Sequence, residues 1–148
     1  MDILSEGLGT ITGWMKGLWP QPAETPHLVQ GKLRPLAGTP NGVSSESTNV
    51  IVRIEPLGFK GSPASAWAIL KGVVQEHGGV VHEAGSNYLW STFTVPLFGF
   101  VDDVEFRLSP EEGVIHVRSS SRLGFSDLGV NRGRVETLRA AFQKALAG

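Results

Sequence analysis

The residues whose types could do chemistry gather between positions 102 and 136 of the chain. Acidic residues come first, and a basic stretch then runs through a glycine-containing loop into a predicted helix, whose N-terminal N–H groups can bind an anion together with arginine side chains. The alternative is a structural network of ion pairs and helix caps, which we favour because networks without a ligand also gather charges. The candidate ligand residues are Arg118, Ser119, Ser121, Arg122, Asp127, Asn131 and Arg132, with Asp103 and Glu105 as associated acidic residues.

Templates for catalysis do not fit these residues. Asp102 and Asp103 are adjacent, so on a strand they point to opposite faces and cannot work as a carboxylate pair. Ser126 follows Gly124 as in a nucleophile elbow, but the next glycine, Gly129, is one place too late. The four histidines lack metal-ligand spacing, and the chain has no cysteine and no phosphate-binding glycine motif. The sequence therefore predicts no catalytic residue, metal or cofactor, and disfavours an enzyme.

Composition narrows the classes of protein further. The 148 residues, 41% of them hydrophobic and 18% charged, suit one compact domain. Thirteen Lys and Arg against fourteen Asp and Glu give a net charge of -1, which argues against nucleic-acid binding. No secretory signal or run of about 18 apolar residues is present, so we expect a cytoplasmic protein that is at most peripheral to a membrane.

A predicted hairpin positions the charged residues. Strands are expected over residues 102–108 and 114–120, joined by a turn at 110–113 and followed by a helix over 131–146. A four-residue loop places Leu108 opposite Ile115, Phe106 opposite Val117, Glu105 opposite Arg118 and Asp103 opposite Ser120. If exposed, the Glu105–Arg118 pair would contribute about 1 kcal/mol or less.

The remaining elements complete an α+β domain over residues 49–148. Alternating apolar residues predict a strand over 49–57. Ser62 and Pro63 begin a helix that Gly78 and Gly79 end, and residues 80–84 and 88–95 form a hairpin around 85–87. The order strand, helix, four strands, helix predicts an antiparallel sheet of about five strands with both helices on one face.

Residues 1–22 and 23–48 precede this domain. Residues 3–19 carry an apolar stripe at helical spacing with Gly9, Gly13 and Gly17 on another face, and the proline-rich segment 23–48 is an extended connector. So many glycines make the helix weak alone, so it packs on its own domain or docks on a membrane or partner. The connection after Pro96 also carries large apolar side chains, Leu97, Phe98 and Phe100. These side chains either fold back into the core or form an apolar patch that contacts a partner or lipid. The residues expected to dock a partner are Leu4, Leu8, Ile11, Trp14, Met15, Leu18, Leu97, Phe98 and Phe100.

Two blocks of sequence, residues 99–107 (GFVDDVEFR) and 115–132 (IHVRSSSRLGFSDLGVNR), resemble the bacterial and plastid family known as domain of unknown function 1499. Pro40–Asn41 and Val43–Ser45 match the family's entry motif, and the resemblance covers residues 33–147. Family members commonly carry cysteines at the positions of Leu36 and Gly42, so no disulfide or metal role of such a pair applies here. The resemblance brings no established activity. Many members of this family carry an export signal or a lipid anchor. The occurrence of the family in cyanobacteria and plastids implies a role in photosynthetic organisms as one option.

These observations lead to two functional hypotheses. The first is a small non-enzymatic accessory module that docks a membrane protein, a membrane surface or a protein partner through its N-terminal helix. The alternative is an anion-binding or hydrolytic domain that uses the polar cluster between residues 103 and 132. A protein or membrane partner is expected under the first, a small-molecule ligand under the second, and the sequence leaves the oligomeric state open.

Overall fold

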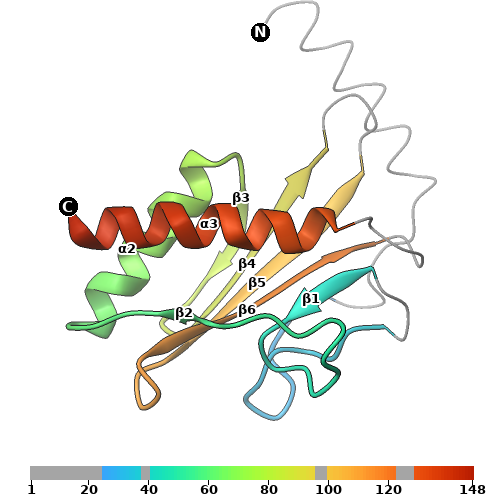
Figure 1. Cartoon of the computed structure of the whole chain (residues 1–148), viewed down its shortest axis with the longest axis horizontal. Helices are drawn as coiled ribbons and strands as arrows, with labels where there is room; N and C mark the ends of the chain where they lie inside the picture. The colour runs from blue at the N-terminus through green and yellow to red at the C-terminus, as the bar shows by residue number, and fades with distance from the viewer. Residues whose placement is uncertain (1–24, 38–40, 96–99, 123–128) are drawn as a thin grey trace, which may run out of the picture.

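A computed structural model describes residues 25–37, 41–95, 100–122 and 129–148 (Figure 1). The predicted α+β class is confirmed, because six strands form one antiparallel sheet and two helices cover one face of it (Figure 1). The strands lie in the order β1-β6-β5-β4-β3, and β2 also pairs with β6. The elements are β1 (Gly42–Ser44), β2 (Leu57–Gly58), α2 (Pro63–Glu76), β3 (Val80–Ala84), β4 (Tyr88–Thr94), β5 (Val101–Ser109), β6 (Val114–Ser121) and α3 (Val130–Ala147).

Helix α2 begins and ends where the sequence predicts. The Ser62 side chain accepts a hydrogen bond from the Ser65 N–H at 3.2 Å, and Pro63 occupies the first helical position. After the helix, Gly78 has a φ of +93°, a backbone conformation that favours glycine. The predicted hairpin of β3 and β4 follows, with a β-bulge between Val81 and Glu83.

The hairpin of β5 and β6 has the predicted register. Glu105 lies opposite Arg118 and Phe106 opposite Val117. Because side chains alternate along a strand, this register directs Phe106 and Val117 toward the helices and Glu105 and Arg118 away from them.

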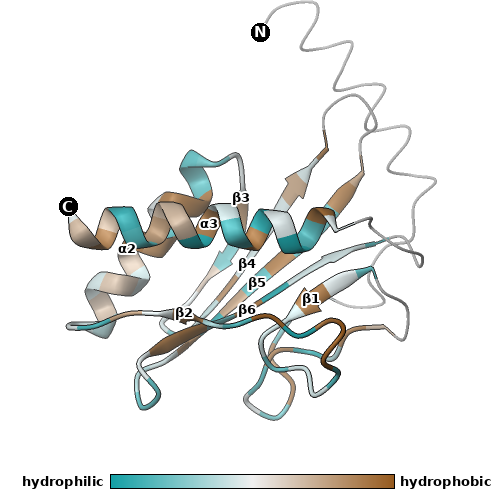
Figure 2. Cartoon of the chain, in the orientation of Figure 1, coloured by the Kyte–Doolittle hydropathy of each residue, from teal (hydrophilic) through white to brown (hydrophobic). Residues whose placement is uncertain are grey.

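The hydrophobic core is formed by buried residues of the sheet and of both helices. Figure 2 shows hydrophobic residues along α2, α3 and the strands that they cover. Helix α3 contributes Val135, Leu138 and Phe142, and α2 contributes Leu70 and Val74. Their partners on the sheet are the fully buried residues Leu57, Leu89, Val104, Phe106, Ile115 and Val117. This face is closed by apolar packing.

The strand predicted over residues 49–57 is wrong for all but its last residue. Residues 50–52 form a turn in which Val50 and Ile51 are 80% and 74% exposed, and only Leu57 enters β2. The reason is local: the Asn49 side chain accepts a hydrogen bond from the Ile51 N–H at 3.0 Å, and the Asn49 carbonyl accepts one from the Val52 N–H. An asparagine that bonds to its own backbone in this way competes with strand formation.

Part of the predicted connector 23–48 joins the sheet. It contains β1, whose Val43 lies in the core, and Leu33 is also buried. The helix predicted over 3–19, with Leu97, Phe98 and Asp127, lies outside the described residues, whereas Phe100 is half-buried. Within the described part of the chain, no helix has the length and apolar character that crossing a membrane requires.

Candidate functional site

Most charged residues of β5 and β6 lie on the face of the sheet that carries no helix. Strand β5 contributes Asp103, Glu105 and Arg107 to this face, and β6 contributes His116 and Arg118. All except Arg107, which is partly exposed, are buried. A row of buried charges requires partners within reach, since an unpaired buried charge is costly.

Glu105 is the centre of this face and is fully buried. Its carboxylate accepts hydrogen bonds from the Tyr88 hydroxyl at 2.7 Å, the Arg34 Nε at 2.8 Å and the Arg118 Nη1 at 3.2 Å. Burial, followed by the charge of Glu105, raises the pKa of the Tyr88 phenol, which therefore stays protonated and donates. Three donors satisfy the carboxylate within the protein itself.

Arg118 joins the sheet to an extended segment that crosses it, here called the strap (residues 33–37). Its Nε donates to the Arg34 carbonyl at 2.9 Å, and its Nη2 donates to the Pro35 carbonyl at 3.0 Å. Its Nη1 donates to the Ser120 hydroxyl at 2.6 Å as well as to Glu105. Burial, with a smaller effect of the Arg34 charge, lowers the pKa of Arg118 to about 10, so the guanidinium stays charged at neutral pH. The guanidinium holds the strap and directs four hydrogen bonds from its three nitrogens to protein acceptors.

Asp103 forms the second centre, nearer the end of β6. Arg122 binds it through both Nε, at 3.0 Å, and Nη2, at 3.1 Å, which is the geometry of a strong bidentate pair. The Trp90 indole N–H donates to the same carboxylate at 3.0 Å. The ring of Trp90 in turn stacks on His82 with 4.6 Å between centroids. Asp103 is thus saturated by protein donors, as Glu105 is.

A chain of three residues at the other end of this face resembles a catalytic triad. The Ser45 Oγ lies 3.0 Å from His116 Nδ1, and His116 Nε2 lies 3.1 Å from the Glu112 carboxylate. However, the Ser45 Oγ also accepts the Val117 N–H at 2.9 Å, and neither Ser45 nor His116 lines the cavity that lies beside the strap. Hydrogen bonds from His116 and Ser109 lower the pKa of Glu112. The hydrogen bonds among Ser45, His116 and Glu112 therefore connect the segment after β1 to β6.

The remaining candidate residues lie on the opposite, helix-covered face. The Ser119 hydroxyl donates to the Asn131 side-chain oxygen at 2.5 Å, and Arg134 Nη1 donates to the same oxygen at 2.9 Å. Arg134 also pairs with Asp102 at 2.7 Å and lies over the ring of Phe93. These contacts join the start of α3 to the sheet, and Ser121 belongs to the same face by alternation.

The structure therefore does not bring the predicted ligand residues into one site. Arg118 and Arg122 lie on the helix-free face, while Ser119 and Asn131 lie on the helix-covered face. Arg132 is exposed and donates to the carbonyls of Ile51 and Arg53. Sequence reasoning missed Arg34, Tyr88 and Trp90 as partners of the acidic residues. Alternation in β4 would have placed Tyr88 and Trp90 on this face once their register with β5 was known, whereas no local signal indicates Arg34.

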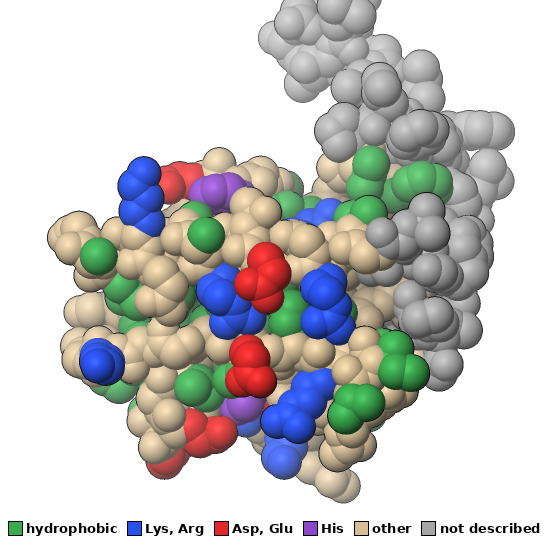
Figure 3. All heavy atoms as spheres, in the orientation of Figure 1, with side chains coloured by type: hydrophobic (Ala, Val, Ile, Leu, Met, Phe, Trp, Pro, Cys, Tyr) green, Lys and Arg blue, Asp and Glu red, His purple; other side chains and the backbone are tan. Residues whose placement is uncertain are grey.

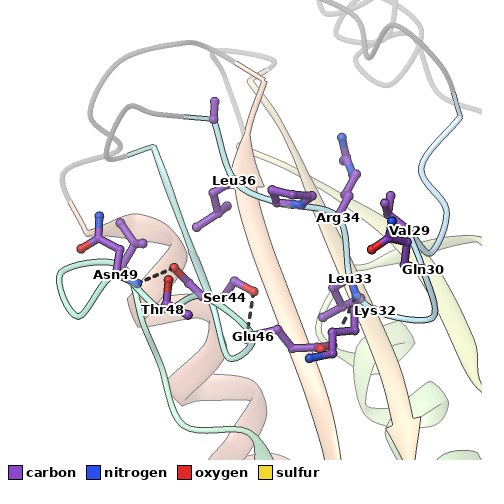
Figure 4. A pocket seen from close by; sticks show the side chains of 14 residues that line it. Val29, Gln30, Lys32, Leu33, Arg34, Leu36, Ser44, Glu46, Thr48 and Asn49 are labelled. Carbon is purple, nitrogen blue, oxygen red and sulfur yellow. Dashed lines mark hydrogen bonds between the residues drawn. The ribbon is translucent and has the colours of Figure 1, made fainter.

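A cavity of about 450 Å³ lies between the strap and residues 44–52 (Figure 4). Lys32, Leu33, Arg34 and Glu46 line it, and Glu46 accepts hydrogen bonds from Arg107 Nε at 2.8 Å and from the Leu33 N–H at 3.3 Å. Two of its charged groups are thus already engaged in ion pairs. Within residues 25–37, 41–95, 100–122 and 129–148, no cluster of His, Cys, Asp or Glu could hold a metal ion.

Comparison with known proteins gives one match. A family model described as "Protein of unknown function (DUF1499)" matches residues 32–142, which is more than half of the chain. No curated protein matches it. The matched range includes the strap, the whole sheet and the network on its helix-free face.

Proposed function

The chain belongs to the DUF1499 family, whose function is unknown, and from its own geometry we propose that it is a binding module without catalytic activity. In this proposal the domain docks on a membrane protein, a membrane surface or another protein through residues 3–19. The protein is then cytoplasmic and peripheral to the membrane, and the folded domain holds the docking segment in place.

One observation carries the proposal: the polar groups of the candidate site bind one another. Glu105 and Asp103 each accept hydrogen bonds from three or more protein donors, and Arg118 directs all three of its nitrogens to protein acceptors. A site for an anion or for hydrolysis needs donors, or a base, that face an open space. A network closed in this way supports a structural role and moves the search for function to the segment before it.

The network also supports the proposal through what it holds. Arg118 and Glu105 fix the strap, which belongs to the connector of residues 23–48 and so lies between the docking segment and the sheet along the chain. A partner bound to residues 3–19 would therefore be linked to the sheet by a short segment rather than by a long free linker.

The test is flotation of the full chain with native membranes and with protein-free liposomes. Leu8→Glu interrupts the apolar stripe of residues 3–19, and Thr10→Glu, outside the stripe, adds the same charge as a matched control. We expect Leu8→Glu to abolish flotation and Thr10→Glu to keep it. Flotation only with native membranes would identify a membrane protein as the partner, and flotation with both would identify lipid. Wild-type-like flotation of Leu8→Glu would refute docking through this segment.

The cavity beside the strap favours a second candidate function, the binding of a small molecule. Its volume of about 450 Å³ lies within the usual range of ligand pockets, and Lys32 could attract an anion. Titration with inorganic phosphate, followed by the amide signals of Lys32 and Thr48 in NMR spectra, tests this candidate. Shifts that saturate, and that Lys32→Gln removes, would support it, while unchanged spectra at millimolar phosphate would exclude phosphate as the ligand.

A further inference from the structure

We propose that the turn of residues 47–53 is a second docking element, which inserts Val50 and Ile51 into the headgroup region of an anionic lipid bilayer. This inference deepens the proposed function, because it names a lipid surface as what the domain contacts. It concerns described residues only, and so it can stand or fail apart from residues 3–19.

Exposure singles out this turn. Val50 and Ile51 are 80% and 74% exposed, the highest values among the large hydrophobic residues that the structure describes. Single exposed apolar residues are ordinary, but two adjacent aliphatic side chains at the tip of a turn form a protrusion. Val130, at the start of α3, is 48% exposed and lies two residues from Arg132, which contacts this turn.

The protrusion is held in shape before it meets any partner. The Asn49 N–H donates to the Ser47 hydroxyl at 3.1 Å, and the Asn49 side chain caps the Ile51 N–H. From the helix side, Arg132 Nη2 donates to the carbonyls of Ile51 and Arg53 at 3.0 and 3.2 Å. These four hydrogen bonds fix the backbone of the turn while the side chains of Val50 and Ile51 stay exposed, so little conformational entropy is lost when the two side chains enter a bilayer.

The charged residues around Val50 and Ile51, which form the tip of the turn, favour an anionic lipid surface as its binding partner. Arg53, Arg132 and Arg139 lie at or beside the tip and outnumber the acidic Glu55 and Glu136. Among the described residues neither Arg53 nor Arg132 takes part in an ion pair, whereas Glu136 is paired with Arg139 at 3.0 Å. Figure 3 shows hydrophobic side chains beside Lys and Arg side chains at the edge of the α3 face. An apolar tip with flanking cations matches a bilayer surface, where the aliphatic groups enter the headgroup region as far as its boundary with the acyl chains and anionic headgroups attract the arginines.

Two aliphatic residues and two arginines give weak, reversible binding alone. Stable attachment to a bilayer generally takes two signals that act together. The stripe of residues 3–19 has acidic Asp2 and Glu6 beside Lys16, so it lacks the positive charge that Arg53 and Arg132 offer. The turn therefore supplies what the first docking segment lacks.

Co-sedimentation of the full chain with phosphatidylcholine vesicles, with and without phosphatidylserine, tests the proposal. The tip variant is Val50→Ser with Ile51→Ser, and its matched control is Val80→Ser, which alters an exposed valine of β3. For charge, Arg53→Gln is compared with Lys71→Gln on the exposed surface of α2. Unchanged denaturation midpoints would show that the variants fold.

We expect the tip variant to lose roughly tenfold or more in partition onto phosphatidylserine vesicles. Arg53→Gln should lose about fivefold there and nothing on phosphatidylcholine alone, and both controls should bind as the wild type does. Added salt should weaken wild-type binding. Wild-type binding by the tip variant, or failure of the wild type to bind either vesicle, would overturn the proposal. In the second case, attachment to native membranes would point to a protein as the occupant.

Leu8→Glu in the same assay separates this inference from the proposed function. Loss of binding in the tip variant together with normal binding of Leu8→Glu would support the turn and refute docking of residues 3–19 on lipid. Loss in Leu8→Glu with normal binding of the tip variant would refute the turn alone.

Discussion

The two faces of the sheet are stabilised by different interactions, although the same strands supply the residues of both. On the helix-covered face, Phe106 and Val117 pack against α3 and are stabilised by leaving water. On the other face, Glu105 and Arg118 are equally buried, but they are neutralised by each other and covered by the strap. Removal of one apolar side chain leaves a gap, whereas removal of one charge leaves its partner buried without compensation. The helix-free face should therefore be the less tolerant of single substitutions and the more sensitive to pH.

The largest effect is expected for Glu105→Ala. This change removes the acceptor of Tyr88, Arg34 and Arg118, so we expect a loss of about 4 kcal/mol in the free energy of unfolding, because a buried partner is left charged. This exceeds the value for an exposed pair, since both groups are buried. Chemical denaturation of Glu105→Ala, Arg118→Ala and the double variant measures the coupling. Additive losses would show that the two residues do not act as a pair.

Leu138→Ala tests the helix-covered face on the same scale. Leu138 is buried in the core, and the cavity that its loss creates should cost about 3 kcal/mol. We expect this loss to be constant between neutral pH and pH 10, because the core cluster that contains Leu138 consists of residues that do not titrate. A loss larger than that of Glu105→Ala would break the comparison between the faces.

Tyr88→Phe should cost less, about 1.5 kcal/mol at neutral pH, because it removes one hydrogen bond to a charged acceptor. The phenol has a raised pKa in the folded state, so its contribution is complete below its ordinary pKa of 10.0 and is lost as pH rises above that value. The difference in stability between wild type and Tyr88→Phe, followed by thermal unfolding from pH 8 upward, should therefore shrink in alkali. A difference that grows with pH would mean that the phenol is not held protonated by its surroundings.

The smallest effect is expected for Glu112→Gln. The pKa of Glu112 is lowered in the folded state, so its contribution is present above its ordinary pKa of 4.5 and is lost as pH falls through the folded value. Its side chain is 55% exposed, which keeps the effect small. Glu111→Gln, at the neighbouring exposed position, is the matched control. Denaturation midpoints of the two variants should differ at pH 6 and converge in acid, and equal midpoints at pH 6 would remove His116 as a partner of Glu112.

Sequence reasoning predicts the hairpin of β5 and β6 to the residue because the information is local. A four-residue turn and strict alternation allow few registers, and only one pairs apolar with apolar and acid with base. The turn at residues 49–52 defeats the same reasoning, because Val50, Val52 and Ile54 alternate like a strand while Asn49 bonds to its own backbone.

The candidate site shows a different limit. Arg118 and Ser119 are neighbours on a strand, so alternation alone assigns them to opposite faces, as it does for Asp102 and Asp103. The separation of the proposed cluster was therefore predictable. The role of Arg34 was not, because 71 residues separate it from Glu105 and only the folded chain brings them together.

The clamp of Arg118 on the strap sets the order in which the chain would come apart under load. The meander from β3 to β6 joins strands that follow one another in sequence, but Arg118 reaches back 84 residues to the Arg34 carbonyl. A pull applied at the N-terminal end meets these few hydrogen bonds before it reaches β1 or the meander. The strap would then detach one hydrogen bond at a time while the sheet stays folded. Force transmitted from a partner bound to the N-terminal segment would therefore unfold the strap before it unfolds the domain.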